Sequence, residues 1–354
     1  MARASFVRGP ILYIIGLLLG VGLTYGWFQQ NLFAPMAPGV TETAPFLVER
    51  GWNLKTICHA LESNGLVRNW WATYFLARLQ GKKLVENDIS KVKPGEYSLS
   101  AGMSPKEILY KFIREEIVYH DLLVTEGSSL RDIATFMAKT TLASQADAWT
   151  ALNNQSLMSK LGIPGTSLEG YLFPDTYRFS RPDNAEIMVM KMVEEHQKKI
   201  ANNRAYVNRA YELGMTMKEV ITLASIIEKE TGNADERKQI SSVFHNRLKL
   251  NMPLQTDPTV IYGVPNFDGN LTKVHLRTPS PYNTYLNRGL PPTPICNPGI
   301  ASIEAALYPA DTDYVYFVAR GDGTSVFSSN YREHQEAVRK YQSGKPVEQG
   351  AANP

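Results

Sequence analysis

The order of apolar and polar positions predicts a membrane helix at the start of the chain. An uncharged, mostly apolar run extends from Pro10 to Phe28, after the basic residues Arg3 and Arg8. A helix of about 20 apolar residues can cross the hydrocarbon core of a bilayer, and basic residues before it favour an N-terminus on the inner side. We therefore expect a single transmembrane anchor over residues 10–28, preceded by a cytoplasmic tip over residues 1–9.

A cleaved signal peptide is the competing interpretation of this run, because Ala34–Ala37 weakly resembles a small-residue cleavage site. Pro38 follows directly and should hinder cleavage, so we favour the uncleaved anchor. The anchor would leave the rest of the chain on the periplasmic or extracytoplasmic side of the inner (plasma) membrane. Residues 29–44 contain proline and glycine without periodicity and are typical of a stalk, and residues 343–354 are typical of a frayed tail.

A short pattern, Val-x-x-Gly-x-x-Leu-x-x-Ile, occurs twice, beginning at Val48 and at Val124. It predicts a strand end, a glycine turn and the first turn of an amphipathic helix, because its Leu and Ile lie three residues apart. Between the copies we expect an aromatic helix beginning at Trp70, a strand over Gly95–Leu99, and a helix opened by a capping box at Ser104. This frame resembles LysM, a small β-α-α-β module that binds N-acetylglucosamine polymers. The alternative is a spacer whose aromatic residues fill a core.

The segment that best fits a catalytic helix begins at Thr216, where a Thr-x-x-Glu capping box precedes about four turns. Its apolar residues form one buried stripe, which Glu230 continues before Gly232 stops the helix. Apolar neighbours and the negative end of the helix dipole raise the pKa of a carboxyl group, and a glycosidic general acid must be protonated. Glu228 lies on another side of the helix, suited to solvent or to a structural ion pair. The alternative for both glutamates is an ordinary solvated helix end.

Three polar, turn-rich segments follow this helix and predict binding loops: Leu254–Gly263, Ser280–Tyr285 and Gly289–Gly299. Loops of this length, rich in proline and in amide and hydroxyl side chains, usually belong to a site because they contribute little packing. Aromatic faces beside amide and hydroxyl groups suit a sugar ring. The alternative is a set of packed loops whose polar side chains satisfy one another.

Composition narrows the chemistry further. The chain has 354 residues, of which 44% are hydrophobic and 20% charged, with a net charge of +3. A strong polyanion binder usually carries a larger basic excess, so we expect no nucleic-acid partner. Cys58 and Cys296 are too few for a disulfide framework, and their spacing does not show whether they pair. The six histidines show no metal-ligand spacing, so we expect neither a metal nor another cofactor.

Five motifs stand in a fixed order: Glu169–Tyr177, Leu223–Thr231, Leu254–Tyr262, Tyr282–Tyr285 and Gly289–Pro292. Together they resemble the MltG (YceG-like) family of endolytic murein transglycosylases over about residues 45–342. The resemblance implies non-hydrolytic cleavage of the β-1,4 bond between N-acetylmuramic acid and N-acetylglucosamine, leaving a 1,6-anhydro end. It also implies that the acid/base is the glutamate before Thr231, which is Glu230, and that no second carboxylate is required.

The expected architecture is α+β, with a single N-terminal transmembrane helix, a small LysM-like module over residues 45–123 and a larger α+β catalytic domain over residues 124–342. The expected substrate is nascent peptidoglycan near the membrane, with cell-wall synthases (penicillin-binding proteins) as candidate partners. Candidate substrate contacts are Gln255, Asp257, Tyr282 and Asn283.

Asp257 allows two further interpretations. It would organise its loop by bonding backbone N–H groups ahead of Pro258, or it would be the second carboxylate of a hydrolytic muramidase. A non-catalytic, membrane-anchored glycan-binding scaffold remains the third hypothesis for the function of the whole chain, after the transglycosylase and the muramidase.

Overall fold

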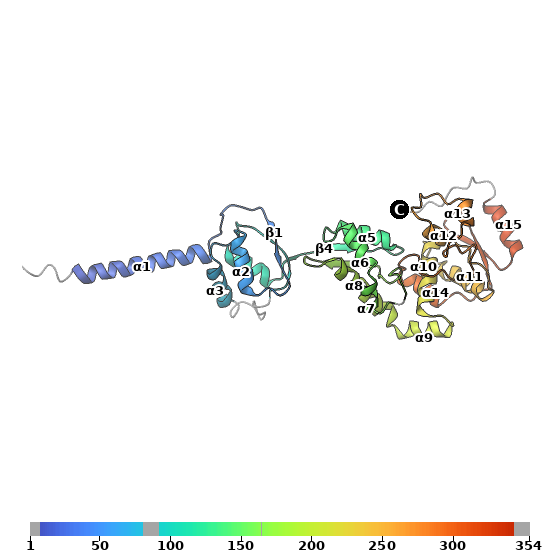
Figure 1. Cartoon of the computed structure of the whole chain (residues 1–354), viewed down its shortest axis with the longest axis horizontal. Helices are drawn as coiled ribbons and strands as arrows, with labels where there is room; N and C mark the ends of the chain where they lie inside the picture. Colours follow the sequence, from blue (N-terminus) through green and yellow to red (C-terminus); the bar gives the residue numbers. More distant parts are fainter. Residues whose placement is uncertain (1–7, 81–91, 164, 343–354) are drawn as a thin grey trace, which may run out of the picture. The chain divides into compact units, whose positions relative to one another are not determined.

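The computed structural model describes residues 8–80, 92–163 and 165–342. Within these residues the fold is mixed α+β, as the sequence predicted (Figure 1). The chain divides into two compact units, of which unit 1 comprises Met1–His120 and Arg178–Asp183, and unit 2 comprises Asp121–Tyr177 and Asn184–Pro354. The predicted tail over 343–354 and most of the predicted tip over 1–9 lie outside the described residues.

The first helix, α1, spans Arg8–Leu32 and extends into the predicted stalk, which is otherwise non-helical up to residue 43. Its side chains are described from Tyr13 onward, and the large apolar ones from there to Phe28 are exposed. Among the residues that the structure describes, no helix is long and apolar enough to cross a membrane. The expected span over residues 10–28 is therefore not confirmed, and the side chains of its first residues, 10–12, lie outside those described.

Unit 1 is built on a three-stranded sheet in the order β1-β2-β3, with both pairs antiparallel. Its strands are β1 (Ala44–Val48), β2 (Gly95–Leu99) and β3 (Ile117–Val118), and its further helices are α2 (Leu54–Ser63), α3 (Trp70–Gln80) and α4 (Pro105–Ile113). Phe46 pairs with Tyr97 across β1 and β2, and the Phe112 ring meets the Tyr97 ring edge-on with centroids 4.8 Å apart. The capping box predicted at Ser104 is confirmed. The element order alone does not establish a LysM-like module, which stays a prediction.

The repeated Val-x-x-Gly pattern forms the same local structure in both units. Gly51 and Gly127 have φ angles of +85° and +76°, which glycine adopts without strain. Leu54 and Leu130 then begin α2 and α5 (Leu130–Lys139), after capping side chains at the preceding residues. The pattern therefore encodes a turn and a helix start, as predicted, in two different units.

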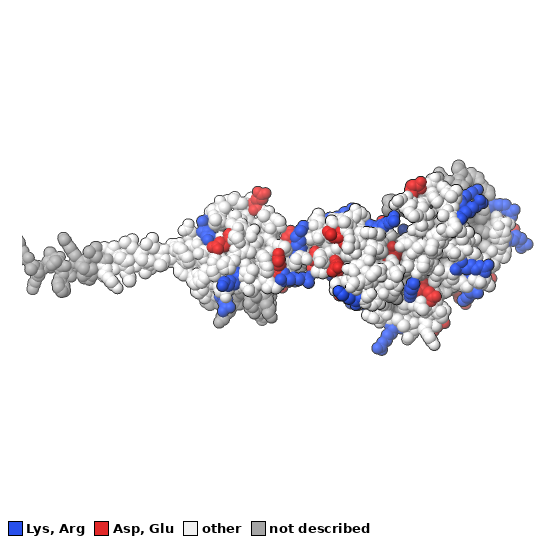
Figure 2. Space-filling view, viewed as in Figure 1, with Lys and Arg blue, Asp and Glu red and all other residues white. Residues whose placement is uncertain are grey.

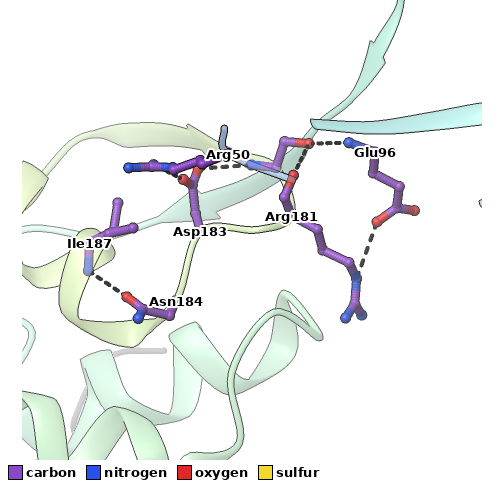
Figure 3. A network of polar contacts seen from close by, with 7 residues as sticks. Arg50, Glu96, Arg181, Asp183, Asn184 and Ile187 are labelled. Atoms are coloured by element: carbon purple, nitrogen blue, oxygen red, sulfur yellow. Dashed lines mark hydrogen bonds and ion pairs between the residues drawn. The ribbon is translucent and has the colours of Figure 1, made fainter. Parts of the chain in front are cut away.

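Unit 1 is completed by residues that follow the chain's passage through part of unit 2. The strands β4 (His120–Leu123) and β5 (Thr176–Phe179) form a two-stranded sheet, and the residues after β5 return to unit 1. There Arg181 Nε lies 3.1 Å from Glu96 Oε2, and Asp183 Oδ1 lies 2.9 Å from Arg50 Nη2 (Figure 3). The Ser180 hydroxyl accepts a hydrogen bond from the backbone N–H of Glu96. Unit 1 is thus discontinuous in sequence.

The first part of unit 2 is helical. After α5 it contains α6 (Gln145–Leu152), α7 (Gln155–Lys160), α8 (Ala185–His196), the π-helical turn η1 (Gln197–Ala201) and α9 (Arg204–Glu212). Helix α6 packs against both α5 and α8. Capping boxes at Ser129 and Ser144 satisfy backbone N–H groups at the starts of α5 and α6. These capping residues therefore fix where the two helices begin.

The second part of unit 2 surrounds α10 (Met217–Glu230). It contains α11 (Arg237–Lys249), α12 (Asp257–Gly263), α13 (Lys273–Arg277), α14 (Ile300–Leu307), β6 (Tyr316–Ala319), β7 (Ser325–Ser328) and α15 (Tyr331–Tyr341). Every residue from Val220 to Ile227 is buried, because α9, α11, α12 and α14 all pack against α10. The sequence predicted one buried stripe, and the difference arises because a helix enclosed on several sides has no solvent face. The strands β6 and β7 pair antiparallel, with Phe317 opposite Phe327.

Candidate active site

Glu230 is the last residue of α10, the helix whose start the Thr216 capping box defines as predicted. Gly232 does not terminate the helix, however. Thr231 takes an extended conformation, with φ −143° and ψ 134°, and so ends the helix one residue earlier. The chain consequently turns away directly after Glu230, which leaves the glutamate side chain at the end of a rigid, buried helix.

Glu230 is half-buried, and burial of its carboxyl group raises the pKa of that group to about 7. The nearby negative charge of Asp257 raises the pKa further, whereas a hydrogen bond from Thr256 and the positive charge of Arg247 oppose the shift. The Thr256 hydroxyl donates to Glu230 Oε1. The sequence predicted the direction of this shift, and its largest cause is loss of hydration. A carboxyl group with a pKa near 7 can hold a proton at neutral pH and can also release it.

A group of three buried threonines supports the residue that contacts Glu230. Thr256 Oγ1 reaches the carboxyl group, while its backbone N–H donates to the Thr284 hydroxyl at 3.1 Å. The Thr259 hydroxyl lies 2.8 Å from that of Thr284 and donates to the Thr256 carbonyl at 2.8 Å. These bonds join the start of α12 to the 280–285 loop. Two of the predicted loops therefore meet at Thr256, the residue that contacts Glu230.

Arg247, on α11, holds the same segment from another side. Its guanidinium donates to the carbonyl of Leu254 at 2.7 Å and to that of Val315 at 2.7 Å. Sequence reasoning did not single out Arg247, Thr256 or Thr284. Both threonines lay inside quoted motifs, but nothing in the sequence distinguishes a hydroxyl that meets the acid from one that packs a loop.

The structure separates the four predicted substrate contacts into two exposed and two more enclosed residues. Gln255 and Asp257 are exposed and flank Thr256, and Gln255 has a φ of +51°, a left-handed conformation that is strained for a residue with a side chain. The side chain of Asp257 accepts a hydrogen bond from the Tyr285 hydroxyl at 2.7 Å. A tyrosine thus holds Asp257, where we had expected backbone N–H groups. Asp257 lies close enough to Glu230 to raise its pKa, whereas Gln255 is placed only by its position before Thr256 in the chain.

Tyr282 and Asn283 have different surroundings. Tyr282 is half-buried, its ring centroid lies 4.9 Å from that of Tyr262, and its hydroxyl lies 2.8 Å from that of Thr293. Asn283 is fully buried, and its amide donates to the carbonyls of Leu276 and Thr278. That amide is used inside the loop, so we assign Asn283 to loop structure and withdraw it as a sugar contact.

Glu228 makes structural contacts, one of the two alternatives that its position on the helix suggested. Its Oε2 accepts the backbone N–H of Gly299 at 3.0 Å, at the start of α14, and Oε1 lies 3.9 Å from the guanidinium of Arg237. A carboxylate at a helix N-terminus satisfies a free N–H group and favours the helix dipole. Cys58 and Cys296 are both buried and free, so neither forms a disulfide.

Glu169 is a second buried carboxyl group that sequence reasoning left without a role. It is 1% exposed and receives hydrogen bonds from the Leu130 N–H, the Asn297 amide and the Tyr262 hydroxyl. Burial raises the pKa of Glu169 to about 7, against the opposing effect of the hydrogen bonds from Leu130 and Tyr262. The signal available in the sequence was its place as the first residue of the motif Glu169–Tyr177.

Comparisons with known proteins agree with the motifs. The YceG-like family matches residues 46–340. An endolytic murein transglycosylase of Bacillus subtilis is 33% identical over 93% of this chain and 92% of its own length. One of Streptococcus pneumoniae is 28% identical over 96% of this chain, which spans 66% of that relative. A yceG-like protein of Listeria monocytogenes of known crystal structure is 32% identical, with a TM-score of 0.57, over 84% of this chain and 99% of its own. The chain therefore belongs to the YceG-like family.

Proposed function

We propose that this protein is a lytic transglycosylase that cleaves murein glycan strands within their length and uses Glu230 as its acid/base. Two of the relatives named above, those of Bacillus subtilis and Streptococcus pneumoniae, support the reaction, since both are endolytic murein transglycosylases. The observation that carries the assignment of Glu230 is its place at the end of α10, partly buried, with a pKa near 7 and Thr256 as a hydrogen-bond donor.

In the proposed reaction a single carboxyl group first gives one proton and then accepts another. Protonated Glu230 gives its proton to the glycosidic oxygen as the bond from that oxygen to the anomeric carbon of the muramoyl residue breaks. The 6-hydroxyl of the same sugar then attacks the anomeric carbon, and the carboxylate of Glu230 accepts its proton. No water is consumed, the products are a free 4-hydroxyl and a 1,6-anhydro end, and Glu230 returns to its protonated state.

A hydrolytic muramidase is the second candidate, because Asp257 lies close enough to influence the pKa of Glu230. A hydrolase needs a second carboxylate as nucleophile or base. The Tyr285 hydroxyl donates a hydrogen bond to Oδ1 of Asp257. This bond favours an orienting or charge-stabilising role for Asp257 over a nucleophilic one.

The test is mass spectrometry of the products formed when the full chain digests purified glycan strands. We expect ends about 18 Da lighter than hydrolysis products, the mass of one water, from the wild type and from Glu194→Gln, and none from Glu230→Gln. Glu194 is an exposed glutamate of α8 and provides the matched control. Full-mass reducing ends would establish the hydrolase, and strand binding without cleavage would establish the glycan-binding scaffold.

Membrane attachment through α1 is part of the proposal. Its support is the long uncharged surface of this helix, on which Tyr13–Phe28 carries exposed apolar side chains and no charge (Figure 2). Two arginines placed at Leu18 and Val21 should release the full chain from lipid vesicles in a flotation assay, because each charged residue in hydrocarbon costs about 3 kcal/mol. The same pair of arginines placed at the exposed Val207 and Tyr211 of α9 should not, and equal flotation of both variants would refute attachment through α1.

An attached enzyme would act on nascent strands on the extracytoplasmic side, beside cell-wall synthases. Site-specific cross-linking from Trp71, which is exposed in unit 1, should capture a strand-polymerising penicillin-binding protein if these enzymes are neighbours.

We infer that unit 1 binds glycan as a LysM-like module, for which the order β1-α2-α3-β2 is the support. Addition of N-acetylglucosamine oligomers to Glu230→Gln protein should then shift NMR signals of unit 1, and unchanged signals would reject the module.

A further inference from the structure

The carboxyl group of Glu169 joins three segments that are distant in sequence. The backbone N–H of Leu130, the first residue of α5, lies 3.2 Å from both carboxyl oxygens. The Asn297 amide donates to Oε1 at 3.1 Å, and the Tyr262 hydroxyl donates to Oε2 at 3.0 Å. Removing a carboxyl group from water is unfavourable unless several donors replace the lost hydration. An enclosed group with donors from three segments fixes those segments relative to one another.

The residues around Glu169 leave little freedom for movement. Asn297 Oδ1 accepts from the N–H groups of Gly170 and Leu172, while its amide donates to the carbonyl of Ser128. A Cβ added at Gly170 would lie 2.5 Å from a side-chain atom of Pro294. The turn at Glu169 therefore fits closely against the 289–299 loop, so Glu169 is itself held rigidly.

Tyr262 connects Glu169 to the helix whose N-cap residue contacts Glu230. It lies near the end of α12, whose N-cap residue is Thr256, and the Thr256 hydroxyl donates to Glu230. No side-chain capping bond is made by Thr256, so its hydroxyl serves the glutamate and not the helix. A single short helix thus has one end held by Glu169 and the other end in contact with the acid.

We propose that Glu169 is a positioning residue for the catalytic acid: through Tyr262 it fixes α12, and α12 holds the Thr256 hydroxyl against the carboxyl group of Glu230. The proposal rests on the proposed acid/base function of Glu230. Glu169 does not touch the substrate in this scheme. It sets the orientation of Glu230 through Tyr262 and α12, and Tyr262 also contacts the ring of Tyr282.

The test uses Tyr262→Phe in the full chain, since this change removes one hydroxyl whereas Glu169→Ala would leave buried donors unsatisfied. We expect kcat to fall about tenfold with KM nearly unchanged, because small displacements of a catalytic group are costly to rate. The Thr256 hydrogen bond lowers the pKa of Glu230. Weakening it should therefore move the alkaline limb of the pH–rate profile to higher pH, which loss of folded protein alone cannot do.

Tyr206→Phe is the matched control, since it removes a similar bond from a tyrosine to Glu304, between α9 and α14. It should leave both kcat and the pH profile unchanged. In a double-mutant cycle, Tyr262→Phe should add little to Thr256→Val, because both act on one hydrogen bond. Additive effects, or an unshifted alkaline limb in Tyr262→Phe, would overturn the proposal while leaving Glu230 as acid. An active Glu230→Gln would instead overturn the proposed function.

Discussion

Glu230 and Glu169 are two buried carboxyl groups of unit 2 with the same raised pKa, about 7, but with different surroundings. Glu169 is 1% exposed and receives hydrogen bonds from three residues. Glu230 is partly exposed, and in the described part of the chain its carboxyl group has the Thr256 hydroxyl as its hydrogen-bond donor. A raised pKa therefore does not by itself mark a catalytic acid. The two glutamates differ in the number of donors that hold the carboxyl group, which is three residues for Glu169 and, in the described part of the chain, Thr256 for Glu230.

The largest expected effect separates the two glutamates by rate. Glu230→Gln should lower kcat by at least about a thousandfold, because it removes the proton that the reaction needs, whereas Glu169→Gln should lower it only about tenfold. Initial rates of release of anhydro ends measure both. Equal losses in the two variants, with both proteins folded, would contradict the distinction.

The second effect concerns how tightly the turn at Glu169 is packed. Gly170 has a φ of +89°, and an added Cβ would meet Pro294 and Ile221 within 3 Å, whereas Gly162, with a φ of +67°, has open space. Gly170→Ala should therefore cost about 3 kcal/mol of unfolding free energy or more, and Gly162→Ala about 1 kcal/mol. Denaturant unfolding of the two variants measures the difference. Similar losses would show that the turn can relax.

The third effect is the pH dependence of stability. In the folded protein both carboxyl groups have a pKa near 7, against a normal value of 4.5, so each is stable in its protonated form. Between these pH values the unfolded chain has already lost the protons that the folded chain keeps. Raising the pH therefore lowers the unfolding free energy until about pH 7.

Glu230→Gln removes one of these two contributions. It should be more stable than the wild type at about pH 8, on the order of 2 kcal/mol, and nearly equal to it at about pH 4.5, with partial exposure reducing the full effect. Guanidinium unfolding at the two pH values measures this. A variant that is less stable than the wild type at the higher pH would show that Glu230 is not kept protonated.

The smallest expected effect tests Asp257, the acidic neighbour of Glu230. Asp257 raises the pKa of Glu230, so Asp257→Asn should move the alkaline limb of the pH–rate profile to lower pH, by roughly half a unit. This direction is opposite to the one expected for Tyr262→Phe. Tyr285→Phe, which keeps the charge of Asp257 but removes its hydrogen bond, is the control and should shift the limb less.

The sequence predicted the parts of this site that depend on local patterns. The capping box at Thr216 and the spacing of apolar residues located α10 and placed Glu230 near its end, but the predicted stop at Gly232 was wrong because Thr231 ends the helix. Arg247, Thr284 and Glu169 bond to residues that are distant in the chain, which are Val315, Thr256 and Tyr262 respectively, so no local pattern distinguishes them from ordinary polar residues. Asn283 illustrates the reverse error, since a buried loop amide and a ligand-binding amide have the same composition and differ only in what surrounds them.

The discontinuity of unit 1 limits how this protein can be cut, permuted or recombined. A fragment that stops at His120 lacks Arg181 and Asp183, and leaves Glu96 and Arg50 without these ionic partners. A fragment that starts at Asp121 carries those two residues without the surface that neutralises them. A gene fusion with one junction therefore reproduces neither unit, and a chimera that exchanges unit 1 needs two junctions, one at each crossing of the chain.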